Sequence, residues 1–202
     1  STESLLEIVN EILDFSRIES GKMQLMEDDY ELRDVLHDTA TAFDLRAKEK
    51  GLYLHLDINE QLTSMYRGDS LRLRQIINNV MSNAIKYTRE GGIRFSVSGH
   101  QEEDSEILHF EIEDTGAGIR EEDLQRLFEA FERIDEKTNR NIEGTGLGMA
   151  ITANLLDMMG STLQVKSTFG EGTTFYFDLK QRVKDWTPMG TFEAQERRDD
   201  SN

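Results

Sequence analysis

The sequence predicts an α/β (α+β) two-layer sandwich in which helices cover one face of a sheet. Two observations carry this prediction. Segments with apolar residues at helical spacing alternate along the chain with pairs of short segments in which apolar and polar residues alternate, as in strands. Glycines and polar residues separate these segments. At 202 residues, 37% of them hydrophobic, the chain is long enough to bury a core.

The first expected element is a helix over residues 5–18, with Gly21 as its C-cap. Its apolar residues form two rows instead of one: Leu5, Ile8, Ile12 and Phe15, and Leu6, Val9 and Leu13. Packing of this helix on its own domain is the simpler explanation. The sharper alternative is a bundle whose other helices lie outside this sequence or come from a partner molecule.

The remaining elements follow from the same patterns. We next expect a strand within 22–30, a helix over 31–50 closed by Gly51, a strand over 52–58, and a helix over 70–87 capped by Asp69 or Ser70. After Gly91 and Gly92 we expect strands near 93–99 and 107–113, a helix near 121–131, a helix ending at Met159, and strands near 163–167 and 173–179.

The chain therefore divides into three parts. We expect the first helix within residues 1–21 and the main domain over residues 22–183, with a polar loop at 133–143. Residues 184–202 hold the only Trp and the only Pro and end in RRDDSN, so we expect a linker or a disordered tail.

Composition excludes several classes of function. The 23 Lys and Arg against 40 Asp and Glu give a net charge of −17, which argues against nucleic-acid binding. The absence of Cys excludes disulfides, thiolate catalysis and cysteine-ligated metals. The sequence contains no apolar run long enough to span a membrane and no signal peptide, so we expect no membrane contact by this segment.

The helix over 70–87 carries a polar face opposite its apolar one. The polar face comprises Arg72, Gln75, Asn79, Asn83 and Lys86. Asn79 and Asn83 are four residues apart and therefore neighbours on the helix surface. For an isolated helix, a solvated surface is the usual explanation of such a face.

Two glycine motifs follow this helix along the chain. The first, Asp114-Thr115-Gly116-Ala117-Gly118-Ile119, ends an expected strand, where a carboxylate can accept from an exocyclic amine and glycines allow close approach to a flat ring. The second, Gly144-Thr145-Gly146-Leu147-Gly148, opens a helix whose amides can bind phosphate. It is neither a Walker loop nor a dinucleotide fingerprint.

Together these motifs resemble the catalytic and ATP-binding domain of sensor histidine kinases, especially hybrid ones. The resemblance covers residues 1–183 and rests on five motifs in order: RLRQIINNVMSNAIKYT, DTGAGI, LFEAFERID, GTGLGMAI and STFGEGTTFYF. The segment LLEIVNEILDFSRIESGKMQL is similar to the end of the dimerisation and phosphotransfer hairpin of such kinases. The implied fold is the Bergerat-type ATP-binding sandwich of the histidine kinase and gyrase superfamily, preceded by one bundle helix.

The resemblance also implies residue roles. Asn83 would hold Mg²⁺ with support from Asn79, Lys86 would meet phosphate charge, and Tyr87 would line the ribose and adenine side. Asp114 would bind the adenine amine, with Gly116, Gly118, Ile119 and Thr173 around the base. The remaining implied contacts, all to the phosphates, are Gly144, Thr145, Gly146, Leu147, Gly148, Arg133 and Arg140. Residues 133–143 would form a lid.

Asn79 discriminates between mechanisms. In the related gyrase and mismatch-repair ATPases a Glu at this place acts as general base for water, and an amide cannot take that proton. The resemblance therefore implies transfer of the γ-phosphoryl to a histidine instead of hydrolysis. His37, in HDTAT, lies after the hairpin on a helix of the catalytic domain, so we expect the phosphoacceptor to lie outside this sequence.

The predicted function is the catalytic module of a two-component histidine kinase. Its implied partners are ATP, Mg²⁺, the phosphoacceptor hairpin, a response-regulator receiver domain and a second copy bound through the first helix. The implied location is cytoplasmic. The alternatives are a degenerate kinase that only binds partners and, third, a hydrolysing ATPase of the same superfamily.

Overall fold

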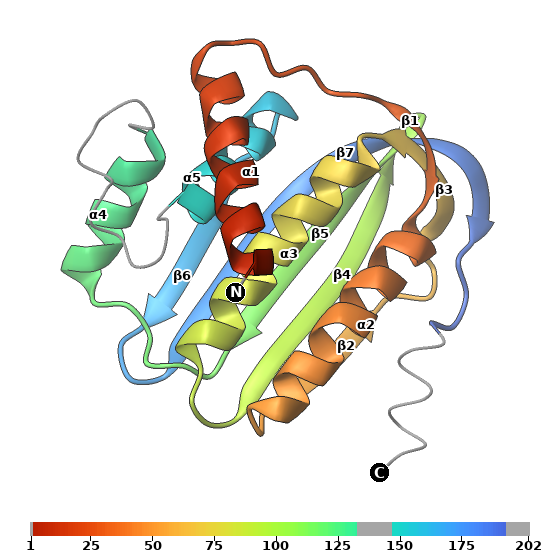
Figure 1. The fold of residues 1–202 in the computed structure, drawn as a ribbon. Helices are drawn as coiled ribbons and strands as arrows, with labels where there is room; N and C mark the ends of the chain where they lie inside the picture. Colours follow the sequence, from red (N-terminus) through yellow and green to blue (C-terminus); the bar gives the residue numbers. More distant parts are fainter. Residues whose placement is uncertain (1, 133–146, 193–202) are drawn as a thin grey trace.

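The computed structural model describes residues 2–132 and 147–192 of the chain. Its helices are α1 (Thr2–Glu19), α2 (Leu32–Glu49), α3 (Ser70–Tyr87), α4 (Glu121–Glu132) and α5 (Leu147–Met158). Its strands are β1 (Asp28–Glu31), β2 (Tyr53–Ile58), β3 (Thr63–Gly68), β4 (Gly92–Glu102), β5 (Ser105–Asp114), β6 (Gln164–Thr168) and β7 (Gly172–Pro188). These elements confirm the predicted two-layer α/β fold (Figure 1).

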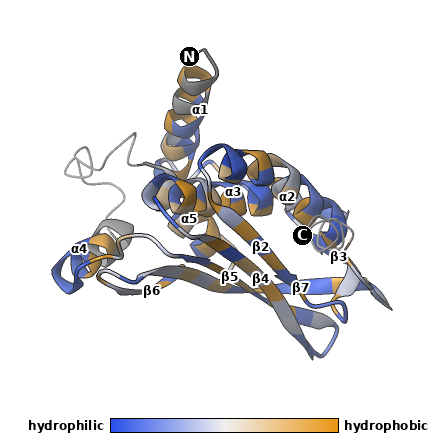
Figure 2. Ribbon diagram, turned by 90° about the horizontal axis from the view of Figure 1, so that it is seen from below, coloured by the Kyte–Doolittle hydropathy of each residue, from blue (hydrophilic) through white to orange (hydrophobic). Residues whose placement is uncertain are grey.

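The strands form one mixed sheet in the order β1-β3-β7-β5-β4-β2, with β6 also paired to β7. Helices α2, α3 and α5 cover one face of this sheet, and α4 lies beside its β6 end (Figure 2). The side chains of β5 alternate as this arrangement requires: Phe110 and Ile112 are buried under the helices, whereas His109 and Glu111, which alternate with them along the strand, are only half-buried.

Helix α3 forms the centre of the helical layer. The Asp69 side chain caps it by accepting from the Arg72 amide at 3.1 Å, as the sequence predicts. Its buried residues are Leu73, Ile76, Ile77, Val80, Met81, Ala84 and Ile85. Burial of each large apolar side chain stabilises the folded state by roughly 1.5–3 kcal/mol. These residues therefore determine which face of α3 points toward the core and which face points away from it.

Three features of the sheet differ from the sequence predictions. Strand β3 was not predicted, because TSMYRG lacks an apolar alternation. Strands β2 and β4 pair in parallel, a direction that the alternation pattern of the sequence does not indicate. Strand β7 continues to Pro188, and Met189 and Phe192 are buried beyond it, so the expected boundary at 184 is wrong. Residues 193–202 lie outside the described residues.

Helix α1 packs against the rest of the fold with its C-terminal end. Phe15 and Ile18 lie against the core, which agrees with packing on its own domain. Gly21, at φ +72°, ends the helix as predicted. The apolar residues left exposed are Leu5, Leu6, Val9, Ile12 and Leu13. None of the helices within residues 2–132 and 147–192 is long and apolar enough to cross a membrane.

Candidate nucleotide-binding site

The polar face of α3 joins the start of α5 through one amide. The Asn79 side-chain nitrogen donates to the Gly148 carbonyl at 3.3 Å and lies 3.2 Å from the Thr152 hydroxyl. Thr152 donates to the same carbonyl at 2.8 Å. Asn79 therefore fixes the first described turn of α5 relative to α3, which is the place where a helix N-terminus can bind anions.

Asn83, Lys86 and Tyr87 continue this face toward the C-terminal end of α3. Asn83 is half-buried one turn beyond Asn79, and Lys86 and Tyr87 are exposed. The Lys86 ammonium lies 5.3 Å from the centre of the Tyr87 ring, a cation–π contact. The row thus offers an amide oxygen, a positive charge and an aromatic ring in sequence.

Asp114 lies at the end of β5 and is 7% exposed. Its carboxylate accepts the Gly116 amide at 2.8 Å. Burial raises the pKa of the Asp114 carboxyl above its ordinary value, and the backbone amides of Gly116 and Thr173 lower this pKa without cancelling the effect. A buried carboxylate beside a loop is suited to accept from a ligand amine that replaces its lost water.

The glycines of the first motif lie where other residues would collide with their neighbours. A Cβ at Gly116 would be 2.5 Å from the Tyr87 carbonyl oxygen, and a Cβ at Gly118, whose φ is +73°, would be 2.3 Å from the Thr168 carbonyl oxygen. The loop after Asp114 therefore touches both the end of α3 and the turn between β6 and β7.

Ser167, near the end of β6, is a member of this site that the sequence analysis did not single out. Its hydroxyl accepts the Ile119 amide at 2.8 Å, donates to the Gly172 carbonyl at 2.8 Å and lies 2.8 Å from the Thr173 hydroxyl. Ser167 stands first in the STFGEGTTFYF motif, which was the available signal.

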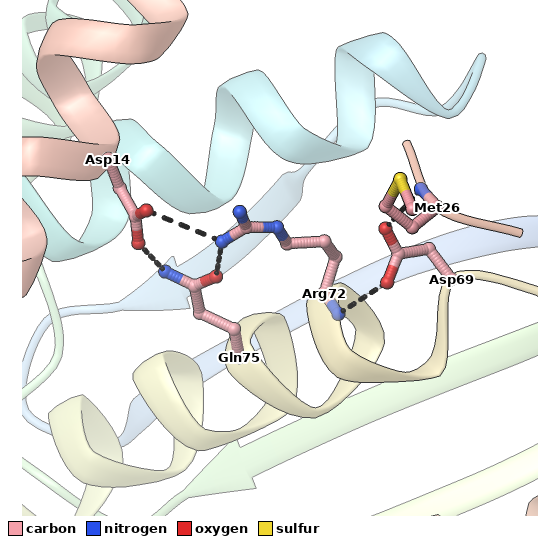
Figure 3. Close-up of polar contacts among 5 residues, drawn as sticks. All are labelled: Asp14, Met26, Asp69, Arg72 and Gln75. Carbon is pink, nitrogen blue, oxygen red and sulfur yellow. Dashed lines mark hydrogen bonds and ion pairs between the residues drawn. The ribbon is translucent and has the colours of Figure 1, made fainter. Parts of the chain in front are cut away.

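Two members of the α3 polar face bind α1 instead of solvent (Figure 3). Asp14 accepts from the Gln75 amide at 2.8 Å and pairs with Arg72 at 3.4 Å, and Arg72 also donates to the Gln75 oxygen at 2.8 Å. The Arg72 and Asp14 side chains are 17% and 15% exposed. This α1–α3 clamp places Glu11 of α1 next to α5, since a Cβ at Gly148 would lie 3.9 Å from a Glu11 carboxylate oxygen.

The structure thus brings together two groups of the predicted residues. Asp114, Gly116, Gly118, Ile119 and Thr173 surround one end of the site, and Asn79, Asn83, Lys86, Tyr87 and Gly148 line α3 and the start of α5. Arg133, Arg140, Gly144, Thr145, Gly146 and the expected lid over 133–143 lie outside the described residues, and only the backbone of Leu147 is described.

One family of known proteins matches the part of the chain that contains these residues. Residues 68–183 match the model described as histidine kinase-, DNA gyrase B- and HSP90-like ATPase. The chain belongs to this ATPase family. The match contains α3, Asp114 and both glycine motifs, so the residues assembled above are those of a family that binds ATP.

Curated relatives are sensor kinases. The chain is 44% identical over 180 residues to the sensor histidine kinase GacS of Pseudomonas protegens and 39% identical over 180 residues to the signal transduction histidine-protein kinase BarA of Escherichia coli. Each match covers 89% of this chain but only 20% of the relative. This chain therefore spans about a fifth of the length of those kinases.

A solved structure has the same fold. The chain is 30% identical to full-length ShkA, described as a complex with AMPPNP, with a TM-score of 0.74. The match covers 90% of this chain and 36% of that one. The histidine-kinase resemblance seen in the sequence motifs is confirmed by these matches.

Proposed function

We propose that this chain is the catalytic module of a two-component sensor histidine kinase, which holds Mg²⁺-ATP for transfer of the γ-phosphoryl to a histidine outside this sequence. The observation that carries the proposal is Asn79. Its amide nitrogen already donates to the start of α5, and an amide cannot take a proton from water at neutral pH. The site therefore lacks the base that hydrolysis needs at this place.

The adenine would bind at the end formed by Asp114 and Thr173. The buried carboxylate accepts from the exocyclic amine, while Gly116 and Gly118 leave room for the ring. Ile119 and Tyr87 line the base and ribose side. The resemblance to ShkA, which was solved with an ATP analogue, supports a nucleotide at this site.

The phosphates would extend along α3 to the N-terminal end of α5. Backbone amides from Gly144 to Gly148 and the positive charges of Lys86, Arg133 and Arg140 would neutralise them. In phosphoryl transfer the protein contributes mostly positioning and charge stabilisation, so no covalent intermediate with this domain is needed.

Mg²⁺ would bind through the Asn83 side-chain oxygen. Among the described residues no cluster of three or more acidic or histidine side chains could hold a metal ion. A neutral amide fits this ion, because Mg²⁺ keeps several waters and takes its other ligands from ATP phosphates. When bound, the ion would shield the phosphate charge while the residues of α3 hold the nucleotide.

The wider partners follow from the same proposal. A second copy bound through α1, the phosphoacceptor hairpin and a receiver domain would meet this module in a cytoplasmic complex. His37, exposed on α2, is not the proposed phosphoacceptor. A degenerate, partner-binding kinase remains the alternative that an inactive but folded chain would favour.

The test is phosphate transfer in trans. The chain is mixed with γ-labelled ATP, Mg²⁺ and the histidine hairpin of the full-length protein, and label on the hairpin is followed together with free phosphate. We expect labelled hairpin, unchanged by His37→Gln and strongly reduced by Asp114→Asn at ATP concentrations that do not saturate the variant. Free phosphate released as fast without the hairpin as with it would support the hydrolase instead, and binding without transfer would support the degenerate kinase.

A further inference from the structure

Two hydroxyl groups lie behind the adenine end of the site. Thr173, near the start of β7, lies directly opposite Asp114 of β5, and both residues are buried, at 6% and 7% exposure. Directly opposed residues on one face of an antiparallel pair have Cβ atoms about 4.5–5.5 Å apart. The Thr173 hydroxyl, whether it donates or accepts a hydrogen bond, therefore lies beside the Asp114 carboxylate.

The hydrogen bonds of Ser167 determine whether the Thr173 hydroxyl is a donor or an acceptor toward the base. The Ile119 amide can only donate and the Gly172 carbonyl can only accept, so the single hydrogen of the Ser167 hydroxyl points to Gly172. One Ser167 lone pair receives the Ile119 amide. The remaining contact, 2.8 Å to Thr173, is then made with the Thr173 hydrogen donated to Ser167.

We infer that Ser167 is a positioning residue for base selection: it draws the Thr173 hydrogen away from the base, so that Thr173 and Asp114 both present acceptors. This inference rests on the proposed function, in which the purine lies against Asp114. A 6-amino group has two hydrogens for these acceptors. A 6-oxo group has none and would face two acceptors with its own lone pairs, which is unfavourable.

The matched nucleotides ATP and inosine triphosphate test this arrangement, because the 6-amino group of the first is a 6-oxo group in the second. With Ser167→Ala, the Thr173 hydroxyl is free to turn its hydrogen toward a 6-oxo group. We expect the preference of the full chain for ATP over inosine triphosphate to fall about three- to tenfold, the loss of one neutral hydrogen bond. Calorimetric titration of both nucleotides measures the ratio.

Three further variants keep the test independent of folding damage. Ser167→Thr retains the hydroxyl and should restore the ratio. Thr173→Val removes the acceptor with nearly the same shape, so it should lower ATP affinity and raise inosine triphosphate affinity. Ser161→Ala, which also removes a serine that bonds a strand carbonyl but lies outside the site, should leave the ratio unchanged.

The outcomes separate this inference from the proposed function. If the unmodified chain binds neither nucleotide, the proposed function itself fails. If the unmodified chain prefers ATP and Ser167→Ala lowers the affinity for both nucleotides by the same factor, Ser167 has only a structural role and the inference is overturned. An unmodified chain that binds the two nucleotides equally also overturns it, because there is then no selection to explain.

Discussion

The two ends of the proposed nucleotide site are built in different ways. At the base end, Asp114 and Thr173 lie on paired strands and are held by backbone amides and by Ser167. At the phosphate end, the described contact between α3 and α5 includes the Asn79 bonds to Gly148 and Thr152. In the proposed function, base recognition would therefore depend on paired strands of the sheet, whereas phosphate binding would depend on how α3 and α5 pack against one another.

The neighbouring helix α1 contacts the second of these regions. Its clamp joins Asp14 to Arg72 and Gln75 of α3, and its Glu11 lies beside Gly148. In a kinase whose phosphoacceptor belongs to the hairpin that ends with α1, this is the end at which the γ-phosphoryl must be delivered. The following predictions separate the two ends, starting with the largest effect.

Asp114→Asn, at the base end, should cause the largest loss of ATP affinity. It replaces a charged acceptor by an amide, and hydrogen bonds to charged groups are worth about 1.5–3 kcal/mol, so ATP affinity should fall by roughly 10- to 150-fold. Calorimetric titration measures the loss. The fold should survive, because an amide oxygen can still accept the Gly116 amide. Unchanged affinity would remove Asp114 from the base site.

The Asp114 carboxyl should also make folding stability and ATP affinity depend on pH. Because burial raises the pKa of Asp114 in the folded chain, its contribution to stability is present below the unfolded pKa and is lost as pH rises through the folded pKa. Asp114→Asn should therefore melt at the same temperature as the unmodified chain or higher at neutral pH. ATP affinity of the unmodified chain should fall as pH is lowered through the raised pKa. A lower melting temperature for the variant at pH 7 would contradict this assignment.

Asn79→Leu should weaken binding of the phosphates and leave binding of the base unchanged. Loss of the Asn79 bonds, each worth about 0.5–1.5 kcal/mol, should reduce ATP affinity and speed amide exchange in the first turn of α5. Affinity for adenosine, which has no phosphates, should stay the same. Equal losses for ATP and adenosine would show that the two ends are not separable.

Arg72→Met should release α1 from α3. The pair is largely shielded from solvent, and leaving Asp14 with only Gln75 should cost about 1–3 kcal/mol of the α1 contact. Hydrogen exchange along α1 should rise without a change in the sheet. Lys180→Met, which breaks an exposed pair with Glu102, is the matched control and should change little. Unchanged exchange in α1 would mean that the clamp does not hold it.

His109, on the face of the sheet away from the helices, should show the smallest effect. Although partial burial lowers its pKa, hydrogen bonds to Glu111 and Asp178 raise it overall. Its stabilising contribution is therefore present below the unfolded pKa and disappears as pH rises through the folded one. His109→Gln should flatten this slope in pH-dependent unfolding while leaving ATP affinity unchanged. A change in ATP affinity would show that the outer face is coupled to the site.

The helices and the site motifs could be predicted because their signals are local. The apolar stripe of α3 and its Asp69 cap lie within one stretch of sequence, and so do the glycines after Asp114. By contrast, β3 is stabilised partly by Thr63, which bonds the distant and buried Glu106. The parallel pairing of β2 with β4 likewise has no local pattern.

The residues that the sequence misplaces or misses depend on contacts between distant segments. Periodicity identifies Arg72 and Gln75 as polar positions, but it cannot show that Asp14, in a separate helix, lies opposite them. The role of Ser167 depends on three partners in three different segments. The end of β7 was predicted as a tail because its side chains are mostly polar, yet β3 pairs with it.

The most direct test of the account is a calorimetric titration of the chain with ATP, with and without Mg²⁺. We predict saturable heat that stops after each injection and tighter binding with Mg²⁺, because in the proposed site Asn79 stands where a hydrolysing ATPase would need a base. Heat that continues after each injection would mean hydrolysis and would contradict the role assigned to Asn79. No heat at all would contradict the nucleotide site itself.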